Sequence, residues 1–530
     1  PNAKVHVARI IVRTEAESLD DEASKWAGEW KESQDDQVVR TVPDLVELYE
    51  ATAMTVWTIA ASFKRATCQP DGVHPRHFLL CSDEVLRAHA ALLNVAQVLC
   101  DVPRVKRQIE LVLLRKPAGG YRTVGHLDSW TRMLQRIQRP AYRRWLALND
   151  RSFWSTESGR GAERTAFRLA VRAESSTAKG LHSCATAMDL RKCFDSADHD
   201  AVWSSVVETG MPLGPSYLSL ALYGWPRRLV CSGAVSREIR AKRGLIAGTV
   251  PATYEVKATM LLPLDAVVKE NPQAMIQAHV DDLTIASEHP RINALLGMHF
   301  AAVEQLVVSL VYGRWSFAFD KTITTTSSNL VSRAITDREI QLAGEVTAAS
   351  RFLGADHAQG RGTRVAARAG TRRKRWLKVA ARRRRNAIVA KACKKAAKRV
   401  TLGGFLPSIG YASAVSGVTA SEEKAMRAMT ATAYGLAGKG KDLELGAIAM
   451  GDRDPVLRYK WAPLKATLEE LWWTHPLLPK RPYLVSAFRI ATAWRQAKLA
   501  GKAGSKAGPI AIAYRLVAET GGEWVNIFTI

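Results

Sequence analysis

Two adjacent carboxylates, Asp281 and Asp282, lie within the stretch AMIQAHVDDLTIAS, which covers residues 274–287. Apolar and polar residues alternate on both sides of the acids, and this period of two predicts a half-buried β-hairpin that turns at the acid pair. Two like charges at one turn repel each other, and a bound cation would offset that repulsion. The alternative is a turn whose two acids are simply solvated.

A third acid, Asp189, ends the alternating run CATAMD and precedes a turn into a predicted helix. Hard divalent cations take carboxylate oxygens as ligands, so an Asp at the end of a buried strand can bind a metal ion. The acids that follow, Asp195, Asp198 and Asp200, are interpreted as helix-capping residues instead.

Basic and glycine-rich segments surround these acids in the sequence. Residues 109–128 are predicted to form strand, turn and strand, with the basic residues Arg115, Lys116 and Arg122 flanking the turn as a phosphate clamp requires. An exposed basic hairpin is the alternative. Gly244 and Gly248 lie in a loop that leads into a long apolar helix, and they would allow the backbone to approach a ligand closely.

The spacing of apolar residues predicts helices at 45–66, 82–100 and 292–312. Residues 1–44 are interpreted as a solvated extension that opens with a strand-like run. The tryptophans at 472–473 are interpreted as core residues.

Residues 361–400 contain no Asp or Glu and are rich in Lys and Arg. Apolar residues interleave with the charges, which predicts a folded helix rather than a loose tail. Uncompensated positive charge should bind phosphates; a nuclear localisation signal is the competing interpretation. The cations that we expect to contact nucleic acid are Arg372, Arg373, Lys374, Arg375, Arg382, Arg383, Arg384 and Arg385.

The composition favours a polyanionic partner. The 530 residues include 76 Lys and Arg against 50 Asp and Glu, a formal net charge of +26, which indicates nucleic acid first and an anionic membrane surface second. The seven cysteines are dispersed and never spaced as CxxC, which favours a reducing, intracellular compartment. No apolar run approaches the length needed to cross a bilayer and no signal peptide is seen, so we expect no membrane partner.

Taken in order, these segments resemble the reverse transcriptase domain, most closely that of non-LTR retrotransposons and group II introns, from about Asp71 to Ser416. MDLRKCFDSADH is similar to the first catalytic motif of the family, RGLIAGTVPAT to its glycine loop and HVDDL to its aromatic-x-Asp-Asp motif. FDKT is similar to the lysine motif, FLG to the primer-grip segment and RKPAGGYRTV to the fingers hairpin that holds the incoming triphosphate.

The resemblance implies an α+β fold of the right-hand polymerase type, with an antiparallel palm sheet, helical fingers and a basic helical thumb. The expected domains are an N-terminal extension at 1–44, fingers at 45–180 with part of 205–240, a palm at 181–355, a thumb at 356–440 and a C-terminal helical region of unknown role at 441–530.

The implied activity is RNA-directed DNA synthesis with Mg²⁺, or Mn²⁺ in its place, in which dNTPs extend the 3′-hydroxyl of a DNA or RNA primer on an RNA template. Such an enzyme would copy a mobile element, and in a eukaryotic host it would be nuclear. By the resemblance, the metal ligands are Asp189, Asp281, Asp282 and the carbonyl of Leu190. The expected nucleotide contacts are Lys116, Arg122, Phe194 and Gly248, and the expected primer-grip contacts are Phe352 and Gly354.

Two residues have alternative roles, and two depart from the family. Phe194 stands at the steric-gate position, where a bulky ring would clash with a ribose 2′-hydroxyl and favour deoxynucleotides; core packing is the alternative. Lys321 would donate a proton to the leaving pyrophosphate; a surface lysine is the alternative. His279 stands where Tyr or Phe is usual, and Ala247 where Gln is usual.

Two other functions stay open. A catalytically silent RNA-binding scaffold, like domesticated maturase relatives, would use the basic segment alone, although clustered carboxylates beside bound phosphates would serve it no purpose. A basic protein of the membrane surface would need an amphipathic helix with a large apolar face, and residues 372–400 are too uniformly basic and too rich in alanine for that.

Overall fold

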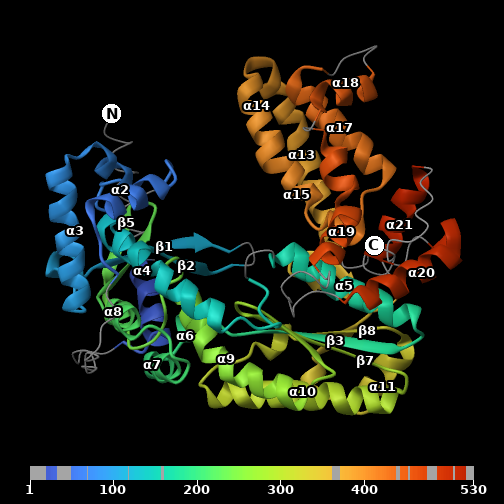
Figure 1. Cartoon of the computed structure of the whole chain (residues 1–530), viewed down its shortest axis with the longest axis horizontal. Coiled ribbons are helices and arrows are strands. Elements are labelled where there is room, and N and C mark those ends of the chain that lie inside the picture. Colours follow the sequence, from blue (N-terminus) through green and yellow to red (C-terminus); the bar gives the residue numbers. More distant parts are fainter. Residues whose placement is uncertain are drawn as a thin grey trace. The chain divides into compact units, whose positions relative to one another are not determined.

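The computed structural model describes residues 19–32, 49–67, 70–116, 119–156, 160–360, 370–436, 442–451, 454–473, 486–504 and 508–520. Helices together with sheets of mixed pairing make it an α+β protein, which confirms the predicted class. The chain forms two compact units (Figure 1). Unit 1 comprises Pro1–Asp150, Leu190–Ala266 and Leu306–Phe317, and unit 2 comprises Arg151–Asp189, Val267–Gln305 and Ala318–Ile530.

Unit 1 contains a four-stranded sheet in the order β2-β1-β4-β5. Its strands are β1 (Ile109–Arg115), β2 (Tyr121–His126), β4 (Arg227–Cys231) and β5 (Ala234–Ile239). β1 pairs antiparallel with β2 and parallel with β4, and alternate residues in the first part of β1 are buried. The hairpin predicted at 109–128 is therefore confirmed.

The helices of unit 1 include α2 (Ala53–Ser62), α3 (Asp83–Val98), α4 (Ser129–Leu148), α6 (Cys193–Ser196), α7 (His199–Glu208) and α8 (Leu213–Tyr223). α3 confirms the helix predicted at 82–100. The helix predicted at 45–66 begins only at Ala53, because the side chain of Thr52 accepts a hydrogen bond from the backbone of Thr55 and caps the helix there. The earlier residues of that prediction, Leu45 and Leu48, lie outside the described part of the chain.

An amphipathic helix at residues 19–29 also belongs to unit 1. Leu19, Ala23, Trp26 and Trp30 recur at helical spacing and are buried, so the expectation of a solvated extension is wrong for this part. The acids between them stay at least partly exposed on the other side of the helix. The strand-like run that was expected earlier in the chain lies outside the described residues.

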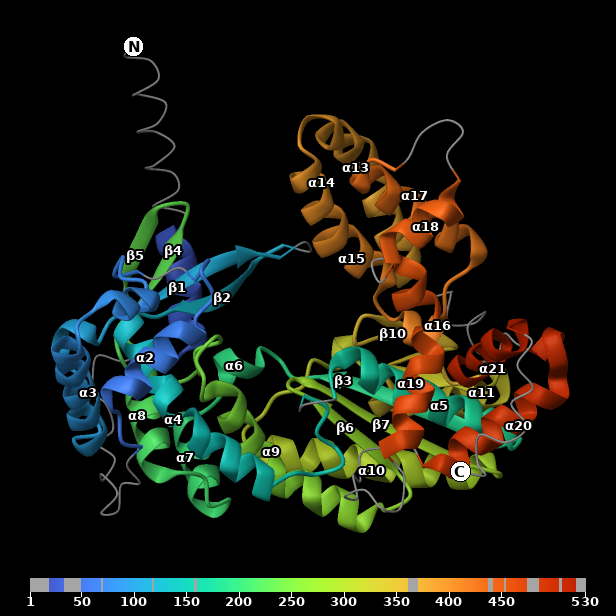
Figure 2. The ribbon, with the colours of Figure 1, turned by 45° about the horizontal axis from the view of Figure 1, so that its top comes forward.

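Unit 2 contains a five-stranded sheet in the order β6-β7-β3-β8-β9. Its strands are β3 (His182–Asp189), β6 (Met275–His279), β7 (Asp282–His289), β8 (Ile323–Thr326) and β9 (Glu345–Thr347). α5 (Ala162–Ala178) covers one face of this sheet and α10 (Ile292–Tyr312) the other (Figure 2). Because both faces are covered, residues 283–287 are all buried, and the expectation of a half-buried hairpin is wrong.

α10 confirms the helix predicted at 292–312, and like α9 (Ala252–Glu270) it contributes residues to both units. By length and composition it could cross a membrane, with a mean hydropathy of 1.7, so the expectation that the sequence holds no such run is wrong. Leu295, Leu296 and Val303 are buried inside the protein, as in the core helix of a globular domain.

The rest of unit 2 is mainly helical. It begins with α11 (Asn329–Thr336) and the hairpin of β10 (Ala349–Phe352) and β11 (Ala355–Ala358). The helices that follow are α13 (Thr371–Ala392), α14 (Lys394–Val400), α15 (Leu406–Gly410), α16 (Ser413–Ser416), α17 (Ala420–Tyr434), α18 (Leu443–Met450), α19 (Ala462–Trp473), α20 (Ala487–Gly504) and α21 (Pro509–Glu519). α13 confirms the helix predicted in the basic segment.

Buried polar contacts hold the C-terminal helices against α5, with which they share a hydrophobic core. The guanidinium of Arg168 donates to the carboxylate of Glu470 at 2.9 Å. Glu174 accepts hydrogen bonds from the first backbone N–H groups of α21 at 2.8 and 2.9 Å, where the helix dipole favours an anion. The region without a predicted role is thus an integral part of unit 2. Trp472 is 68% exposed, so the interpretation of residues 472–473 as core is wrong for this tryptophan.

Candidate active site

Three carboxylates lie at one end of the unit 2 sheet. Asp189 is the last residue of β3 and Asp282 the first of β7, and the two are direct cross-strand partners. Asp282 also pairs with His279 of β6, which leaves Val280 and Asp281 as the two-residue turn. The turn therefore comes one residue earlier than predicted, and the sheet brings together acids from two segments that are far apart in the sequence.

These carboxylates act on one another electrostatically. The side chain of Asp282 is exposed. Even so, desolvation by the surrounding protein and the charges on Asp281 and Asp189 raise its pKa to about 6. The positive charges of Arg351 and Lys321 act in the opposite direction. A divalent cation relieves repulsion of this kind, and carboxylate oxygens are the donors that suit Mg²⁺ or Mn²⁺.

Lys321 neutralises one of these acids. Its ammonium group donates to Asp189 Oδ2 at 2.6 Å, and this hydrogen bond raises the pKa of Lys321. Among the described residues, no three His, Cys, Asp or Glu side chains are grouped closely enough to hold a metal ion. To surround a cation, the carboxylates would have to move closer together and Lys321 would have to leave Asp189.

The turn is strained, and neighbouring backbone holds it. Val280 has a left-handed φ of 61°, which a β-branched residue rarely adopts and which costs about 1–3 kcal/mol. Nδ1 of His279 is hydrogen-bonded to the carbonyl of Ser155 at 3.1 Å, and the N–H of Ser155 donates to the carbonyl of Ala278 at 3.0 Å. His279 therefore has a structural role in fixing β6.

A buried polar network fixes the strands that carry the acids. His299 of α10 is hydrogen-bonded to Thr186 of β3 at 2.8 Å and to Ser287 of β7 at 3.0 Å. Thr186 is also bonded to Thr324 of β8 at 2.8 Å. Burial lowers the pKa of His299 to about 3, so the ring is neutral at neutral pH. The sequence alone does not predict this network, because one histidine in an apolar helix gives no sign of its partners.

The residues predicted to contact a nucleotide lie in unit 1. Lys116 and Arg122 are exposed at the β1–β2 hairpin, as a phosphate clamp requires. Gly248 is exposed and has a φ of +104°, which favours glycine. The carbonyl of Ala247 accepts a hydrogen bond from the N–H of Gly125 at 2.8 Å, so β2 holds this part of the loop.

The segment after Asp189 combines a half-buried aromatic ring with structural residues. The carbonyl of Phe194 accepts a hydrogen bond from the N–H of Leu245 at 2.7 Å, and the side chain of Leu190 is buried. Asp198 caps α7, as expected. Asp195 does not cap a helix, because its carboxylate accepts a hydrogen bond from a threonine of β2 at 3.0 Å, so its interpretation as a capping residue is wrong.

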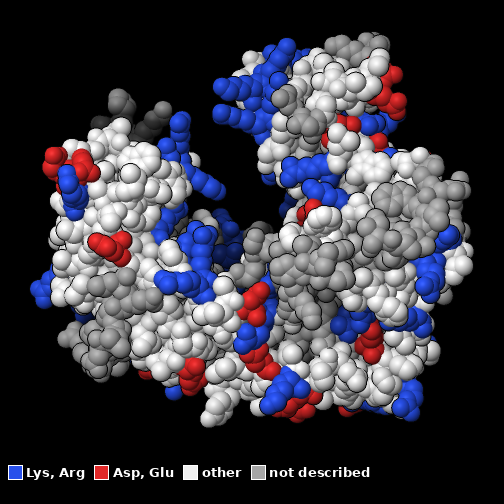
Figure 3. Space-filling view, in the orientation of Figure 1, with Lys and Arg blue, Asp and Glu red and all other residues white. Residues whose placement is uncertain are grey.

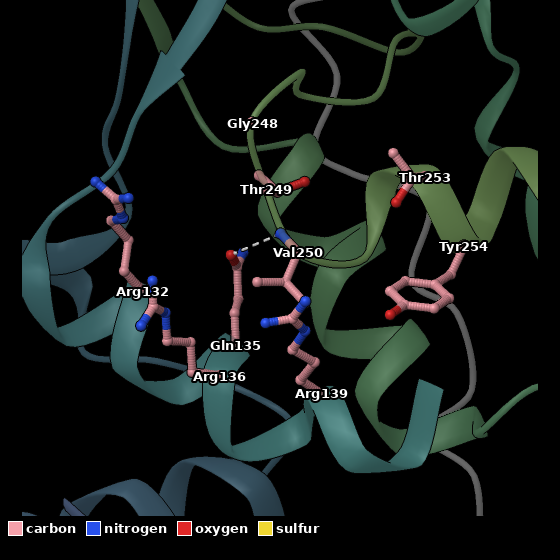
Figure 4. A pocket seen from close by; sticks show the side chains of 9 residues that line it. All are labelled: Arg132, Gln135, Arg136, Arg139, Gly248, Thr249, Val250, Thr253 and Tyr254. Carbon is pink, nitrogen blue, oxygen red and sulfur yellow. Dashed lines mark hydrogen bonds between the residues drawn. The ribbon is translucent and has the colours of Figure 1, made fainter. Parts of the chain in front are cut away.

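A cavity of about 270 Å³ in unit 1 was not predicted (Figure 4). Arg132, Arg136 and Arg139 approach it from α4, and the loop at 248–250 lies opposite; none of the nine lining residues is acidic. Burial lowers the pKa of Arg136, and the charges of the other two arginines add to this effect. Gln135 accepts from the backbone of the loop at 3.3 Å, while its buried amide nitrogen has no hydrogen-bond partner. The cavity therefore suits an anion, and the spacing of its arginines along one helix face was the signal in the sequence.

The predicted cations of α13 fall into two groups. The exposed ones are Arg373, Lys374, Arg382, Arg383, Arg384 and Arg385. Lys and Arg side chains gather over α13 and α14 in the space-filling view (Figure 3). Arg372 instead donates to Glu422 at 2.8 Å, and Arg375 donates to the carbonyl of Gly354. These two arginines stabilise the fold, so the exposed group is the part of the prediction that stays available to a ligand.

The predicted primer-grip residues lie at the β10–β11 hairpin. Phe352 is buried in the core that includes α5, so its ring is not at the surface. Leu353 and Gly354 form the two-residue turn, with φ of 45° and 80°, as in a type I′ turn. The hydroxyl of Tyr411 donates to the carbonyl of Leu353 at 2.6 Å. Any contact with a primer would therefore be made by this turn, which Phe352 supports from inside.

No family model matches the chain, and no curated protein matches it. Among solved structures, the chain is similar to apo telomerase from Candida tropicalis, truncated from its C-terminal domain, with a TM-score of 0.32 and 12% identity. The match covers 43% of this chain and 51% of that one, so this chain spans about half the length of the telomerase chain. A likeness of this size assigns neither fold nor activity.

Proposed function

We propose that the chain is an RNA-directed DNA polymerase of the reverse-transcriptase type, with a right-hand architecture. The observation that carries this proposal is the pairing of Asp189 with Asp282 across β3 and β7, with Asp281 in the adjoining turn. The unit 2 sheet would be the palm, the β1–β2 hairpin would belong to the fingers, and α13 to α17 would form the thumb.

The acid cluster would serve as a divalent-cation site. Asp189, Asp281 and Asp282 would hold Mg²⁺ or Mn²⁺ through their oxygens, and ions bound there would activate the primer 3′-hydroxyl and stabilise the charge of the triphosphate. Lys321 retains its proton while it contacts Asp189. Once released from that carboxylate, its ammonium group could donate the proton to the leaving pyrophosphate.

Side chains of unit 1 would bind and select the nucleotide. Lys116 and Arg122 are exposed and cationic, and they would bind the triphosphate. Phe194 would exclude a ribose 2′-hydroxyl by the bulk of its ring. Gly248 lacks a side chain at an exposed point of the loop, so the backbone there could approach the nucleotide closely.

Two basic surfaces would bind the template RNA and the DNA or RNA primer. The exposed cations of α13 have no acidic residue in their helix and would contact backbone phosphates. In the cavity beside α4, the helical rise separates Arg132 from Arg136 by about 6 Å and Arg136 from Arg139 by about 4.5 Å along the axis. A row of cations at such intervals can follow the phosphates of one strand.

Primer extension tests the proposal. The protein is given an RNA template, an annealed DNA primer and Mg²⁺, with dNTPs in one reaction and NTPs in another, and the product lengths are measured. We expect extension with dNTPs. If primers were extended in the NTP reaction but not in the dNTP reaction, the selective role of Phe194 would be contradicted and the protein would be an RNA polymerase.

One observation favours a second function, an RNA-binding scaffold without catalysis. Lys321 is hydrogen-bonded to Asp189, and in the described part of the chain the acids are not grouped closely enough to hold a metal ion. A protein without catalytic activity needs no metal site, so this arrangement is compatible with a scaffold. Absence of extension by both the wild type and Asp281→Ala, with steeply salt-dependent RNA binding by both, would establish the scaffold.

A further inference from the structure

The end of the N-terminal helix is hydrogen-bonded to the glycine loop (residues 243–250). Trp30, which follows the helix at 19–29, is fully buried. Its carbonyl oxygen accepts hydrogen bonds from the N–H groups of Lys242 at 3.0 Å and Arg243 at 3.1 Å. These two bonds fix the backbone where the loop begins.

Gly244 packs the loop against two other segments. Its φ is +90°, and a Cβ atom there would lie 2.8 Å from the carbonyl oxygen of Asp195 and 3.0 Å from Cδ1 of Trp30. Any side chain at this position would push these segments away. The N–H of Gly244 donates to the carbonyl of Ala197 at 2.8 Å, and the next N–H donates to the carbonyl of Phe194 at 2.7 Å. The loop and the turn that carries Phe194 therefore share backbone hydrogen bonds.

Two polar residues connect these segments to the unit 1 sheet: half-buried Asp195 contacts β2, and buried Arg227 belongs to β4. Oδ1 of Asp195 accepts from the hydroxyl of Thr123 at 3.0 Å, next to the proposed triphosphate clamp. The guanidinium of Arg227 lies 4.8 Å from the ring centre of Trp30 and donates to the carbonyl of Gly244 at 2.6 Å. Trp30, Asp195 and Arg227 form a group that we call the brace.

The contacts of the brace differ from those of an ordinary apolar core. A tryptophan that packs only against apolar side chains stabilises a fold without fixing the direction of any backbone group. Trp30 instead contacts a buried guanidinium, and its carbonyl orients two N–H groups of the loop. A second contact joins the N-terminal helix to the Phe194 segment at the surface, where the ammonium group of Lys192 donates to Glu29 at 2.9 Å.

We infer that the N-terminal helix is a positioning element for nucleotide selection, in which Trp30 holds the Phe194 turn, the glycine loop and β2 in the arrangement that admits a deoxynucleoside triphosphate. This inference rests on the proposed polymerase function and adds to it residues that touch no substrate. Loss of the brace lets the Phe194 turn shift. A small shift of the ring makes room for a 2′-hydroxyl, so discrimination against ribonucleotides falls.

The variants Trp30→Phe, Trp30→Ala and Asp195→Asn test the brace in the full-length protein. Trp145→Phe is the matched control, because Trp145 is a buried tryptophan of the same unit whose indole N–H bonds the carbonyl of Thr209. Without nucleotide, hydrogen exchange in peptides covering 190–198 and 240–250 should be roughly tenfold faster in the brace variants and unchanged in the control. The ratio of kcat/KM for a dNTP to that for the matching NTP should fall by roughly tenfold, with a smaller change in kcat for the dNTP.

The hydrogen-exchange rates and the dNTP-to-NTP ratio together decide whether the brace positions the Phe194 turn. Unchanged exchange in both peptides would overturn it, and so would faster exchange with an unchanged dNTP-to-NTP ratio, because the brace would then only stabilise the fold. Where Trp30→Ala does not fold, Trp30→Phe and Asp195→Asn decide by the same two measurements. If the wild-type protein extended no primer, the proposed polymerase function itself would be overturned. The wild-type reaction shows this without any variant, so it is distinguishable from a failure of the brace inference.

Discussion

At the scale of single residues, the β6–β7 turn combines backbone strain with charge repulsion. Val280 holds a left-handed conformation. Desolvation by the surrounding protein, together with the charges on Asp281 and Asp189, raises the pKa of Asp282 and so disfavours its ionised form. Both features lower the stability of the folded chain. A turn of this type normally carries Gly or Asn at the strained position. The arrangement costs stability and places three carboxylates at one end of the sheet, where they would have to move closer together to surround a cation.

Replacing Val280 separates backbone strain from side-chain packing. Val280→Gly and Val280→Ala both remove the apolar packing of valine, but only glycine relieves the positive φ. We expect Val280→Gly to be the more stable of the two by about 1 kcal/mol in urea denaturation. At Ala278, an ordinary strand position, Ala→Gly should instead cost about 1 kcal/mol. If Val280→Ala proved the more stable variant, the turn would not be strained.

At the scale of elements, the unit 2 sheet depends on the contacts of α10. Replacing His299 by Leu removes the ring partner from the hydroxyls of Thr186 and Ser287. Since a buried polar group without its partner costs about 1–3 kcal/mol, we expect the free energy of unfolding to fall by about 2–4 kcal/mol. Glu304→Leu, on the exposed side of the same helix, should change it by less than about 0.5 kcal/mol. A His299→Leu protein as stable as the wild type would contradict the role of the network.

The same elements show what the sequence could and could not predict. Alternation placed Asp189 at the end of a strand and the acid pair Asp281 and Asp282 at a hairpin turn, because side-chain direction has a period of two in any strand. It could not place the turn at Val280, because a β-branched residue with positive φ opposes the local preference. It also could not show that both faces of β7 are buried, since α5 and α10 cover it from other parts of the chain.

Charged segments mark a second limit of sequence reasoning. Composition treats all cations of the basic segment alike, whereas Arg372 has a partner in Glu422, fifty positions further along the chain. Trp30 lay in a segment rich in acids, and its burial depends on contacts with the glycine loop. Such pairings arise only in the tertiary structure.

At the scale of the whole molecule, a net charge of +26 predicts salt-dependent association with RNA. Replacing the four exposed arginines at 382–385 by Ala should reduce the slope of log K against log salt concentration by about 0.7 for each phosphate that is no longer neutralised, or about 3 in all. Fluorescence anisotropy with a labelled RNA measures this slope. Arg87→Ala, at an exposed arginine of α3 that pairs with Asp83, should leave it unchanged. An unchanged slope in the fourfold variant would place the RNA elsewhere.

The stability of the whole protein should also depend on a buried carboxylate of unit 1. Burial raises the pKa of Glu255 from 4.5 to about 7, and the hydroxyl of Tyr223 donates to it at 2.6 Å. Between these two pKa values the folded chain keeps a proton that the unfolded chain has released. The contribution of protonated Glu255 is therefore fully present below about pH 4.5 and is lost as the pH rises through about 7.

Glu255→Gln removes this titration. Between about pH 4.5 and 8, the stability of the wild type relative to Glu255→Gln should fall by an amount on the order of 3 kcal/mol, measured by urea denaturation at each pH. Glu304→Gln, at an exposed position, should keep a constant difference from the wild type. A constant difference for Glu255→Gln as well would show that this carboxylate titrates normally.

The rate of single-nucleotide incorporation on an RNA template tests the central claim most directly, with the wild type, Asp281→Asn and Asp337→Asn compared at saturating Mg²⁺. Asn keeps the shape of Asp but removes its charge, and Asp337 is an exposed acid at the end of α11, outside the acid cluster. We predict that Asp337→Asn retains the wild-type rate and that Asp281→Asn slows incorporation at least about a hundredfold while staying folded. An Asp281→Asn protein that incorporates dNTPs at the wild-type rate would contradict the assignment of the β6–β7 turn as the catalytic centre.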